Sequence, residues 1–335
     1  MALRLLEMVL QEKDSADIRE LLKDCKVLEY RQIRLGDEEV LLRILLDVER
    51  SETVLDLLEK RYTSMEGNRV VILPVEATLP RAQSEPKTEA AATPEQMTPE
   101  EEMPQRIGRE ELYEDIKNGA RLSRTYLAIV VLSTVVAAIG LSHNSVAVII
   151  GAMVIAPLLG PNIAMSLGIT LGDLSLLRQG FWTATVGVMA ALALSVLIGV
   201  MLDVDPTLLE LASRTRVGLG DIVLALASGC AGALAFTTGV PTALIGVMVA
   251  VALLPPLVTS GLLFGGGHPT LAMGAFVLFL VNLICVNLAG MTTFFVQGIK
   301  PTNWWEKDRA VRATRIAIAL SVVLLAALVS IILLV

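Results

Sequence analysis

Hydrophobic and charged positions divide this chain into two unlike parts. Residues 1–124 hold 46 of the 61 Asp, Glu, Lys and Arg side chains, whereas residues 125–335 hold only 15 of them in 211 positions. No charge occurs between Arg124 and Asp173, and three more charge-free windows follow. A helix needs about 20 apolar residues to cross a bilayer. The pattern therefore predicts a water-soluble N-terminal part followed by an α-helical multi-pass membrane domain at 125–335.

The charge-free windows divide at their turn signals into seven predicted membrane spans. They lie near residues 125–142, 145–170, 180–202, 219–238, 241–264, 271–296 and 315–334. These spans divide the connecting segments between two faces of the membrane. One face holds only two basic residues, Arg214 and Arg216, whereas the face that bears the N-terminus holds eleven: Arg106, Arg109, Lys117, Arg121, Arg124, Arg178, Lys300, Lys307, Arg309, Arg312 and Arg315. Because basic residues collect on the cytoplasmic side, we expect the N-terminus to be cytoplasmic and the C-terminus to be outside.

Residues 1–76 are predicted to form a small α+β domain. Alternating apolar residues indicate strands at 3–10, 27–35, 40–48 and 69–75, and helical patterns occupy 15–25 and 51–62. Gly36-Asp37 is a hairpin turn signal between the second and third strands. The order βαββαβ is that of a ferredoxin-like domain. This fold serves small-molecule sensors and assembly domains alike, so both interpretations stay open.

Two segments connect this domain to the membrane part. Residues 77–107 contain five prolines, six glutamates and no aromatic residue. Such a composition cannot bury enough apolar surface to fold, so it predicts a disordered linker. Residues 108–124 show an amphipathic pattern with acidic residues first and basic residues last, as the helix dipole prefers. We expect a juxtamembrane helix there.

A shift of 95 residues superposes one half of the membrane domain on the other. Residues 151–161 (GAMVIAPLLGP) align with residues 246–256 (GVMVAVALLPP), and residues 151–167 include seven identities. The same shift aligns the first three predicted spans with the next three. Chance similarity among apolar residues is the alternative, but prolines, glycines and span boundaries that match in one register favour duplication. The repeats are expected near 125–215 and 220–310.

The repeat has three spans, so its two copies must cross the membrane in opposite senses. The prediction is an inverted 3+3 repeat followed by one further span. Proline lacks an N–H donor and interrupts helices, which leaves carbonyl groups without partners. Such interruptions are expected in spans two and five, each roughly 20 Å from the face at which its span enters the membrane. Because the two spans enter from opposite faces, the interruptions should meet near the bilayer midplane. Simple kinks are the alternative to a binding site. The interrupting residues are Pro157, Gly160 and Pro161 in span two, and Pro255 and Pro256 in span five.

The polar residues near the expected interruptions are all uncharged. Oxygen atoms of Ser, Thr and Asn, together with carbonyl groups, suit Na⁺ or a neutral solute, and the N-termini of half-helices suit a small anion. No Asp, Glu, Lys or Arg falls deep in any predicted span, which argues against a proton carrier, because such a carrier needs an ionisable group inside the membrane. Each residue alone is more often a helix–helix contact than a ligand. The candidates are Asn162, the best of them, with Ser166, Thr259, Ser260 and Asn282, and Thr170 and Asn287 lie nearby.

Other kinds of chemistry find little support in the sequence. Three cysteines and two histidines form no cluster, so we expect neither a transition-metal site nor a cofactor. No nucleophile–base pair is evident, and Gly265–Gly267 lacks the lysine of a phosphate loop, so we expect no enzyme activity. The acidic balance of residues 1–124 argues against a nucleic-acid partner.

Three segments resemble a known family of prokaryotic hydrophobic membrane proteins. They are residues 111–123 (ELYEDIKNGARLS), 151–168 (GAMVIAPLLGPNIAMSLG) and 253–256 (LLPP). The sequence is similar to the family called domain of unknown function 389 over roughly residues 110–335. The resemblance implies a prokaryotic cell membrane as the location. It implies no substrate and no catalytic residue, because the family has no settled activity.

These observations lead to two alternative functions. The first is translocation of a small solute or ion, as a transporter or channel, with regulation by the cytoplasmic domain. The second is a membrane-anchored sensor or scaffold in which the spans only hold an assembly together. The expected partners are the lipid bilayer, the solute or ion, and further copies of the chain in a homo-oligomer.

Overall fold

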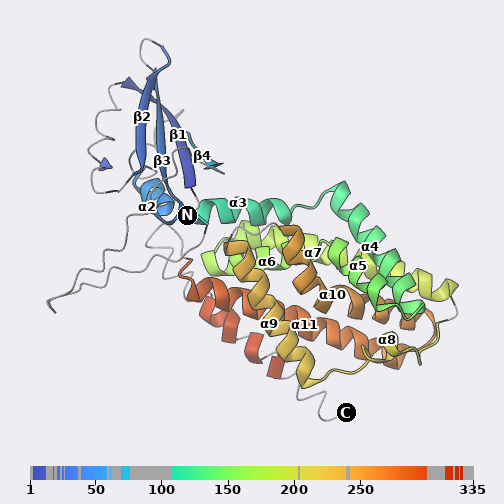
Figure 1. Cartoon of the computed structure of the whole chain (residues 1–335). Coiled ribbons are helices and arrows are strands. Elements are labelled where there is room, and N and C mark those ends of the chain that lie inside the picture. Colours follow the sequence, from blue (N-terminus) through green and yellow to red (C-terminus); the bar gives the residue numbers. More distant parts are fainter. Residues whose placement is uncertain are drawn as a thin grey trace, which may run out of the picture. The chain divides into compact units, whose positions relative to one another are not determined.

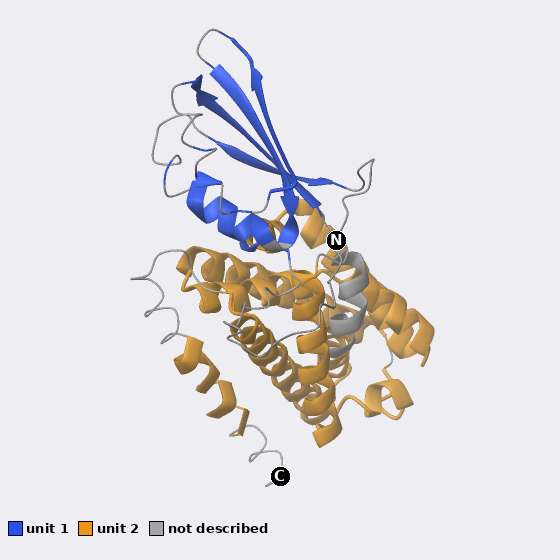
Figure 2. Ribbon diagram, turned by 60° about the vertical axis from the view of Figure 1, so that its left-hand side comes forward, with its two compact units in different colours: residues 1–110 blue, residues 111–335 orange. Residues whose placement is uncertain are grey.

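The computed structural model describes most of the chain, in two compact units that we treat separately (Figure 2). Unit 1 comprises residues 1–110 and unit 2 comprises residues 111–335. The predicted linker at 77–107 lies outside the described residues except for Ile107. The structure describes residues 3–12, 27–36, 39–58, 69–75, 107–202, 204–238, 242–299 and 314–326 without 320 and 324, with the single positions 18, 21, 22, 25 and 61; for residues 242–252 it describes the backbone alone.

Unit 1 contains a four-stranded antiparallel sheet whose strands lie close to the predicted ones (Figure 1). The order across the sheet is β2-β3-β1-β4, so β3 lies between β1 and β2, and β1 lies between β3 and β4. Each pair of parallel strands is thus separated by one inserted strand, which is the arrangement of a split βαβ unit. The strands are β1 (Leu3–Gln11), β2 (Glu29–Arg34), β3 (Glu39–Asp47) and β4 (Val70–Val75).

One face of this sheet forms the core of unit 1. Alternate residues of β1 and β3, such as Leu6 and Ile44, are buried because successive side chains of a strand point to opposite faces. Helix α2 (Val48–Leu58) adds further apolar side chains to the same core. It begins three residues before the predicted start at Ser51, whose hydroxyl donates a hydrogen bond to the Val48 carbonyl (2.7 Å). Of the predicted helix at 15–25, only residues 18, 21, 22 and 25 are described.

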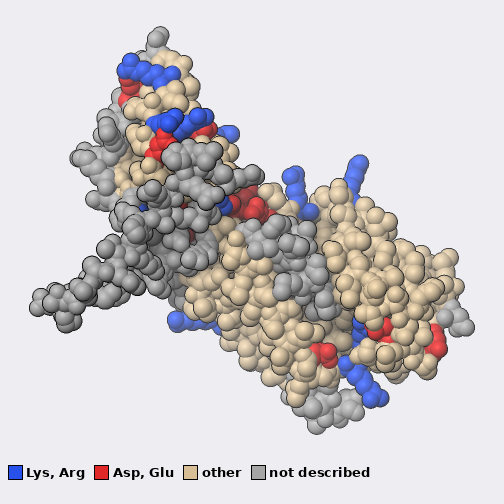
Figure 3. Space-filling model, in the orientation of Figure 1, with Lys and Arg blue, Asp and Glu red and all other residues tan. Residues whose placement is uncertain are grey.

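Unit 2 is built from helices, most of which are apolar on nearly all sides; α3, at its start, is instead rich in charged residues. Helix α3 is the first of these helices along the chain, and eight more labelled helices follow it in the described residues (Figure 1). They are α3 (Arg109–Gly119), α4 (Arg124–Ser142), α5 (Val146–Ile155), α6 (Leu159–Leu171), α7 (Leu174–Met201), α8 (Leu209–Ala212), α9 (Leu219–Thr237), α10 (Thr242–Gly265) and α11 (Pro269–Val296). The surface of the helical unit carries few charged side chains in Figure 3, as expected for a surface that faces lipid.

The turns of unit 2 follow from local sequence. Gly172 adopts a left-handed conformation (φ 72°) that ends α6, and Asp173 then caps α7 by accepting hydrogen bonds from the backbone N–H groups of Ser175 and Leu176. Ser123 caps α4 in the same way through the N–H of Tyr126. These caps fix the boundaries of the helices that surround the candidate site.

Among the described residues, four helices are long and apolar enough to cross a membrane. They are α4, α7, α9 and α11. Helices α5 and α6 pass the same test together and are bent by 50° at their junction, which gives up to five spans. The described apolar side chains of α10 cover only Leu253–Gly265, and the last predicted span is described as a short helix at Thr314–Val323.

The expected interruption of span five is not found. Helix α10 is helical on both sides of Pro255 and Pro256, so the expectation of two matching breaks is wrong. Both prolines are buried, and α10 packs against α7, α9 and α11. This packing stabilises the helical conformation of α10. The prolines alone would weaken it, because each proline removes one intrahelical hydrogen bond.

Candidate functional site

The break between α5 and α6 is the local feature on which the site is built. Helix α5 ends at Ile155, and Ala156 leaves the helical region with φ −64° and ψ 122°. This extended conformation is the one that a residue before proline prefers, and Pro157 follows. Pro161 lies in the first turn of α6, where N–H groups have no partner within the helix. The helix therefore restarts at Leu159 and tolerates this second proline.

Three polar side chains meet immediately after this break. Asn287 Nδ2 on α11 donates a hydrogen bond to Asn162 Oδ1 on α6 (3.1 Å). Ser166 Oγ, one turn further along α6, lies 3.2 Å from both the carbonyl oxygen and the side-chain Oδ1 of Asn287. The Asn162 side chain also donates to the Leu158 carbonyl at the start of α6 (2.7 Å). We call Asn162, Ser166 and Asn287 the Asn–Ser cluster; it connects the broken span to α11.

A cavity of about 440 Å³ lies beside the Asn–Ser cluster. Asn162 and Asn287 are part of its wall, and most of the remaining wall is apolar, as is common in pockets that bind small molecules. No ionisable side chain is found among the described residues that line it. The lining residues are Leu158, Asn162, Met165 and Ile169 of α6, Leu177, Phe181, Ala184, Thr185 and Val188 of α7, Leu253 of α10, Phe279, Leu283, Ile284, Asn287 and Met291 of α11, and Ser321.

The hydrogen-bonding capacity of the cluster is only partly used. Asn287 Nδ2 donates to Asn162 Oδ1 and to the Leu283 carbonyl (2.9 Å), so both of its N–H groups are engaged. Asn162 Oδ1 accepts the bond from Asn287 Nδ2, and Asn287 Oδ1 can accept one from Ser166 Oγ, so each amide oxygen keeps a second lone pair. The cluster can therefore accept hydrogen bonds from a ligand, or contribute oxygen ligands to a cation, without first losing an internal bond.

Two residues expected in the site have a structural position instead. A Cβ atom on Gly160 would lie 2.5 Å from the carbonyl oxygen of Gly119, so the bare backbone of α6 allows the end of α3 to approach. A Cβ atom on Gly180 of α7 would lie 2.8 Å from the Pro161 carbonyl oxygen, which therefore faces α7. Gly160 and Pro161 thus determine how α6 packs against α3 and α7.

The predicted polar residues of α10 and α11 do not join the Asn–Ser cluster. Thr259 and Ser260 are buried on α10, and Asn282 is buried on α11, but none of the three lines the cavity. Among the described residues, Thr259 Oγ1 finds no hydrogen-bond partner. Pro157 lies in the break itself, while Pro255 and Pro256 lie within α10. The structure thus brings together Asn162 and Ser166, out of the ten predicted site residues, with a partner from α11.

That partner, Asn287, was not predicted as a site residue. One sequence signal marks its position: Gly290 follows three residues later, on the same face of α11. A Cβ atom on Gly290 would lie 2.8 Å from Ser166 Oγ, so the glycine allows α11 to approach α6 closely. A small residue and a polar residue on one face of an apolar helix together indicate a helix–helix contact.

A second group of polar contacts lies where α3 meets the turn between α6 and α7. Tyr113 Oη donates a hydrogen bond to Asp173 Oδ2 (2.7 Å), and burial, followed by this bond, raises the pKa of Tyr113 to about 12. Partial burial opposes ionisation of Asp173, but hydrogen bonds from Ser175, Tyr113 and the backbone outweigh it and hold its pKa below the usual value. Gln179 Nε2 also donates to the Lys117 carbonyl (2.8 Å). These contacts attach α3 to the end of α7.

Long apolar helices, one of them broken beside an uncharged polar cluster, place the chain among the α-helical membrane proteins. The chain belongs to the family described as "Domain of unknown function (DUF389)", whose pattern matches residues 153–288 and so includes both Asn162 and Asn287. This confirms the resemblance found in the sequence. "Uncharacterized protein MJ0678" of Methanocaldococcus jannaschii is 36% identical over 287 residues, which cover 86% of this chain and 85% of that protein. No solved structure matches the chain.

Proposed function

We propose that the membrane unit carries a small solute or ion across the bilayer along a path that passes the Asn–Ser cluster, under regulation by the N-terminal domain. The proposed architecture is seven spans, six of them in two inverted repeats, as in many transporters. The observation that carries the proposal is one helix–helix contact that occurs twice, with the two repeats in interchanged roles. The cavity at the broken span and its uncharged polar groups supply the site.

The exchanged contacts follow from the 95-residue shift. If two repeats are related by a two-fold axis, a contact between residue i of the first and residue j of the second must recur between i + 95 and j − 95. Ser166 of α6 contacts Gly290 of α11. The equivalent pair is Gly261 and Ser195, and a Cβ atom on Gly261 of α10 would overlap the Ser195 side chain of α7. The same serine–glycine contact therefore occurs twice, with the roles of the repeats exchanged.

The helix boundaries support the same relation. Helices α4 and α9 each have 19 residues, and α7 and α11 each have 28. The first residues of α9 and α11, Leu219 and Pro269, both follow those of α4 and α7, Arg124 and Leu174, by 95 positions. Since helix ends are usually defined only to within one or two residues, agreement at both ends of both pairs favours duplication over chance.

Contacts between residues near helix ends support an arrangement in which successive spans cross the membrane in alternating directions. On the predicted cytoplasmic side, Tyr113 reaches Asp173, and Gln297 Nε2 donates to Thr237 Oγ1 (2.9 Å). On the other side, the Glu210 N–H donates to Asn144 Oδ1 (3.0 Å). In each case the two residues lie outside the predicted spans or at their ends, in segments that the seven-span arrangement assigns to one face. Together with the distribution of basic residues, these contacts favour a cytoplasmic N-terminus and an external C-terminus.

The two repeats differ in polarity at the cluster. The positions equivalent to Asn162 and Asn287 are Leu257 and Leu192, which are apolar. One half thus carries hydrogen-bonding groups beside the cavity where the other half carries leucines. Packing alone does not require asparagines there, since the same helix contact is made with leucines in the other half. This asymmetry favours a ligand-related role for the asparagines.

A flux screen tests the proposal. Purified protein is reconstituted into liposomes, and uptake of labelled inorganic ions and small neutral metabolites is compared with uptake into protein-free liposomes. The expected result is protein-dependent, saturable or conductive flux of at least one class. Absence of flux for every class in vesicles whose protein is correctly folded would contradict translocation.

The rival function is a membrane-anchored sensor or scaffold without transport. One observation favours it: Asn162, Ser166 and Asn287 bond one another, as residues that only connect helices do. The flux screen separates the two functions, because a scaffold needs no path for a solute.

A further inference from the structure

The first two turns of α7 extend beyond the part of the helix that a bilayer needs. At about 1.5 Å per residue, its 28 residues span about 42 Å, which exceeds the roughly 30 Å hydrocarbon layer by about eight residues. The C-terminal end of α7 is apolar through Val200 and Met201, whose side chains are exposed. The polar residues Ser175, Arg178 and Gln179 all lie near its N-terminal end. The surplus length therefore belongs to residues 174–181, at the level of the lipid headgroups.

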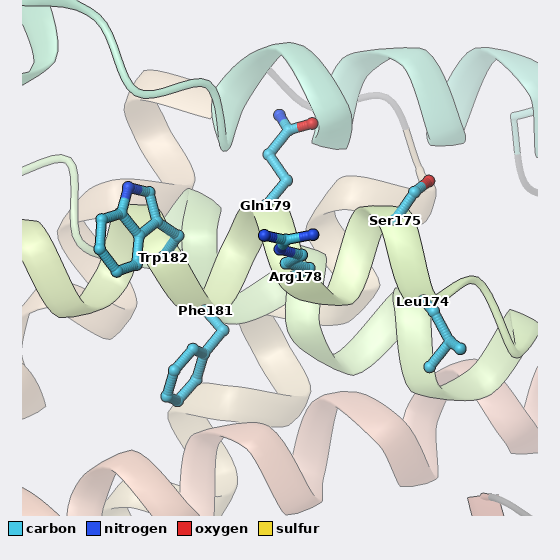
Figure 4. Close-up of a pocket in the computed structure, with 6 residues that line it drawn as sticks. All are labelled: Leu174, Ser175, Arg178, Gln179, Phe181 and Trp182. Atoms are coloured by element: carbon cyan, nitrogen blue, oxygen red, sulfur yellow. The ribbon is translucent and has the colours of Figure 1, made fainter.

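A surface groove of about 820 Å³ lies along this surplus segment (Figure 4). Large apolar side chains are exposed in it: Leu174 to 77%, Phe181 to 60% and Trp182 to 61%. In Figure 4, Gln179 points toward α3, whereas Leu174 and Phe181 point to the opposite side of α7. The described residues that line the groove all belong to α7.

Arg178 is the one charged residue among the described groove residues. The Ser175 hydroxyl donates to Asp173 (2.7 Å), and the Gln179 amide donates to the Lys117 carbonyl, so both neighbouring polar groups are engaged. Arg178 is exposed, and no hydrogen bond or ion pair joins it to any described residue. The nearby Asp173 carboxylate is occupied by Ser175, Tyr113 and the start of α7. A free guanidinium thus lies between exposed aromatic and aliphatic side chains.

We propose that this groove binds an anionic phospholipid. A guanidinium pairs with phosphate oxygens in a two-pronged geometry, and Trp182 occupies the boundary between headgroup and hydrocarbon that indole rings prefer. Phe181, which lies on the bilayer side of Arg178 along α7, supplies apolar surface for the glycerol backbone and the first acyl carbons. A soluble phosphate would use Arg178 alone and would leave these apolar side chains exposed. Charge and apolar surface together therefore favour a lipid.

The equivalent segment of α11 makes a useful comparison. The positions 95 residues after Arg178 and Trp182 are Met273 and Val277, so that segment offers neither a cation nor an indole ring. The groove is therefore a feature of α7 and not a general property of helices of this length. Its predicted location is the cytoplasmic face, where anionic lipids attract basic side chains.

Lipid binding by the full-length protein in detergent tests the proposal. Dioleoyl phosphatidylglycerol and dioleoyl phosphatidylcholine are titrated separately, and native mass spectrometry measures the bound fraction. We expect phosphatidylglycerol to bind more tightly than phosphatidylcholine, and Arg178→Gln to weaken it by about tenfold, as loss of a charged hydrogen bond predicts. Arg178→Lys is expected to keep part of the preference, because the charge remains while the two-pronged geometry is lost.

Arg216→Gln is the matched control, because Arg216 is exposed and belongs to the opposite predicted face. It should leave the preference for phosphatidylglycerol unchanged. Equal binding of the two lipids to the unmodified protein would overturn the proposal, and so would an unchanged preference in Arg178→Gln. Displacement of phosphatidylglycerol by inorganic phosphate would identify a site for a free anion instead. Circular dichroism and gel filtration establish that each variant is folded.

Discussion

At the scale of single residues, Asn162 and Asn287 illustrate what a sequence can indicate and what it cannot. Asn162 follows a Gly-Pro pair in an apolar span, so its position beside a helix break was predictable. Asn287 lies in an unbroken apolar helix, and only the nearby Gly290 marks its face. A hydrogen bond between residues 125 positions apart depends on how α6 and α11 pack, and no local pattern fixes that packing. The partner of Asn162 therefore emerged only from the structure.

The two asparagines should be energetically coupled. Asn162→Leu leaves one N–H of the half-buried Asn287 amide without its acceptor, and we expect a loss of about 1 kcal/mol in stability. Asn162→Leu combined with Asn287→Leu removes both partners and reproduces the Leu257 and Leu192 pair of the other repeat. The double variant should therefore be more stable than the sum of the two single changes predicts. Thermal unfolding of all four proteins measures this, and strict additivity would contradict a direct contact.

At the scale of helices, proline content predicted one break correctly and one wrongly. Pro157 and Pro161 flank the restart of a helix, where a missing N–H costs little. Pro255 and Pro256 lie inside α10, whose buried neighbours hold it helical. The sequence shows where hydrogen bonds are missing but not whether tertiary contacts offset their loss. Strand positions in unit 1 were easier to predict, because alternation of apolar residues is a local signal.

Gly160 offers a test of helix packing. Gly160→Ala places a methyl group 2.5 Å from the Gly119 carbonyl, so α3 must move away from α6. We expect a loss of about 1–3 kcal/mol and faster proteolysis near α3. Gly151→Ala is the control, since a Cβ atom at Gly151 meets nothing within 4 Å and alanine favours helix. Equal stability of the two variants would show that the close contact between α3 and α6 does not contribute to the stability of the protein.

At the scale of the whole molecule, the proposed inverted repeat makes a prediction about sidedness. Ser175 and Thr270 are exposed and occupy equivalent positions in α7 and α11. In a protein without its three native cysteines, Ser175→Cys should react with an impermeant maleimide from the cytoplasmic side and Thr270→Cys from the outside. A cysteine added at the C-terminus should also react from the outside. Labelling of Ser175→Cys and Thr270→Cys from one side would rule out inversion.

The proposed repeats and sidedness can be predicted from the sequence, whereas the cavity cannot. The 95-residue shift and the distribution of basic residues depend only on the order of residues along the chain. The cavity is formed mainly by side chains from two parts of the chain, α6 with α7 and α10 with α11, which are far apart in that order. Its apolar residues resemble the lipid-facing residues of the same helices, and only packing distinguishes the two sets.

The central claim is that a solute passes the Asn–Ser cluster, and flux through the double variant Asn162→Leu, Asn287→Leu tests it most directly. The other repeat already accommodates leucines at these positions, so the variant should fold and reconstitute normally. The account predicts that flux of the identified solute falls at least about tenfold, because the variant lacks both side-chain amides found among the described residues of the cavity wall. Flux equal to that of the unmodified protein, at equal amounts of folded protein per vesicle, would contradict it.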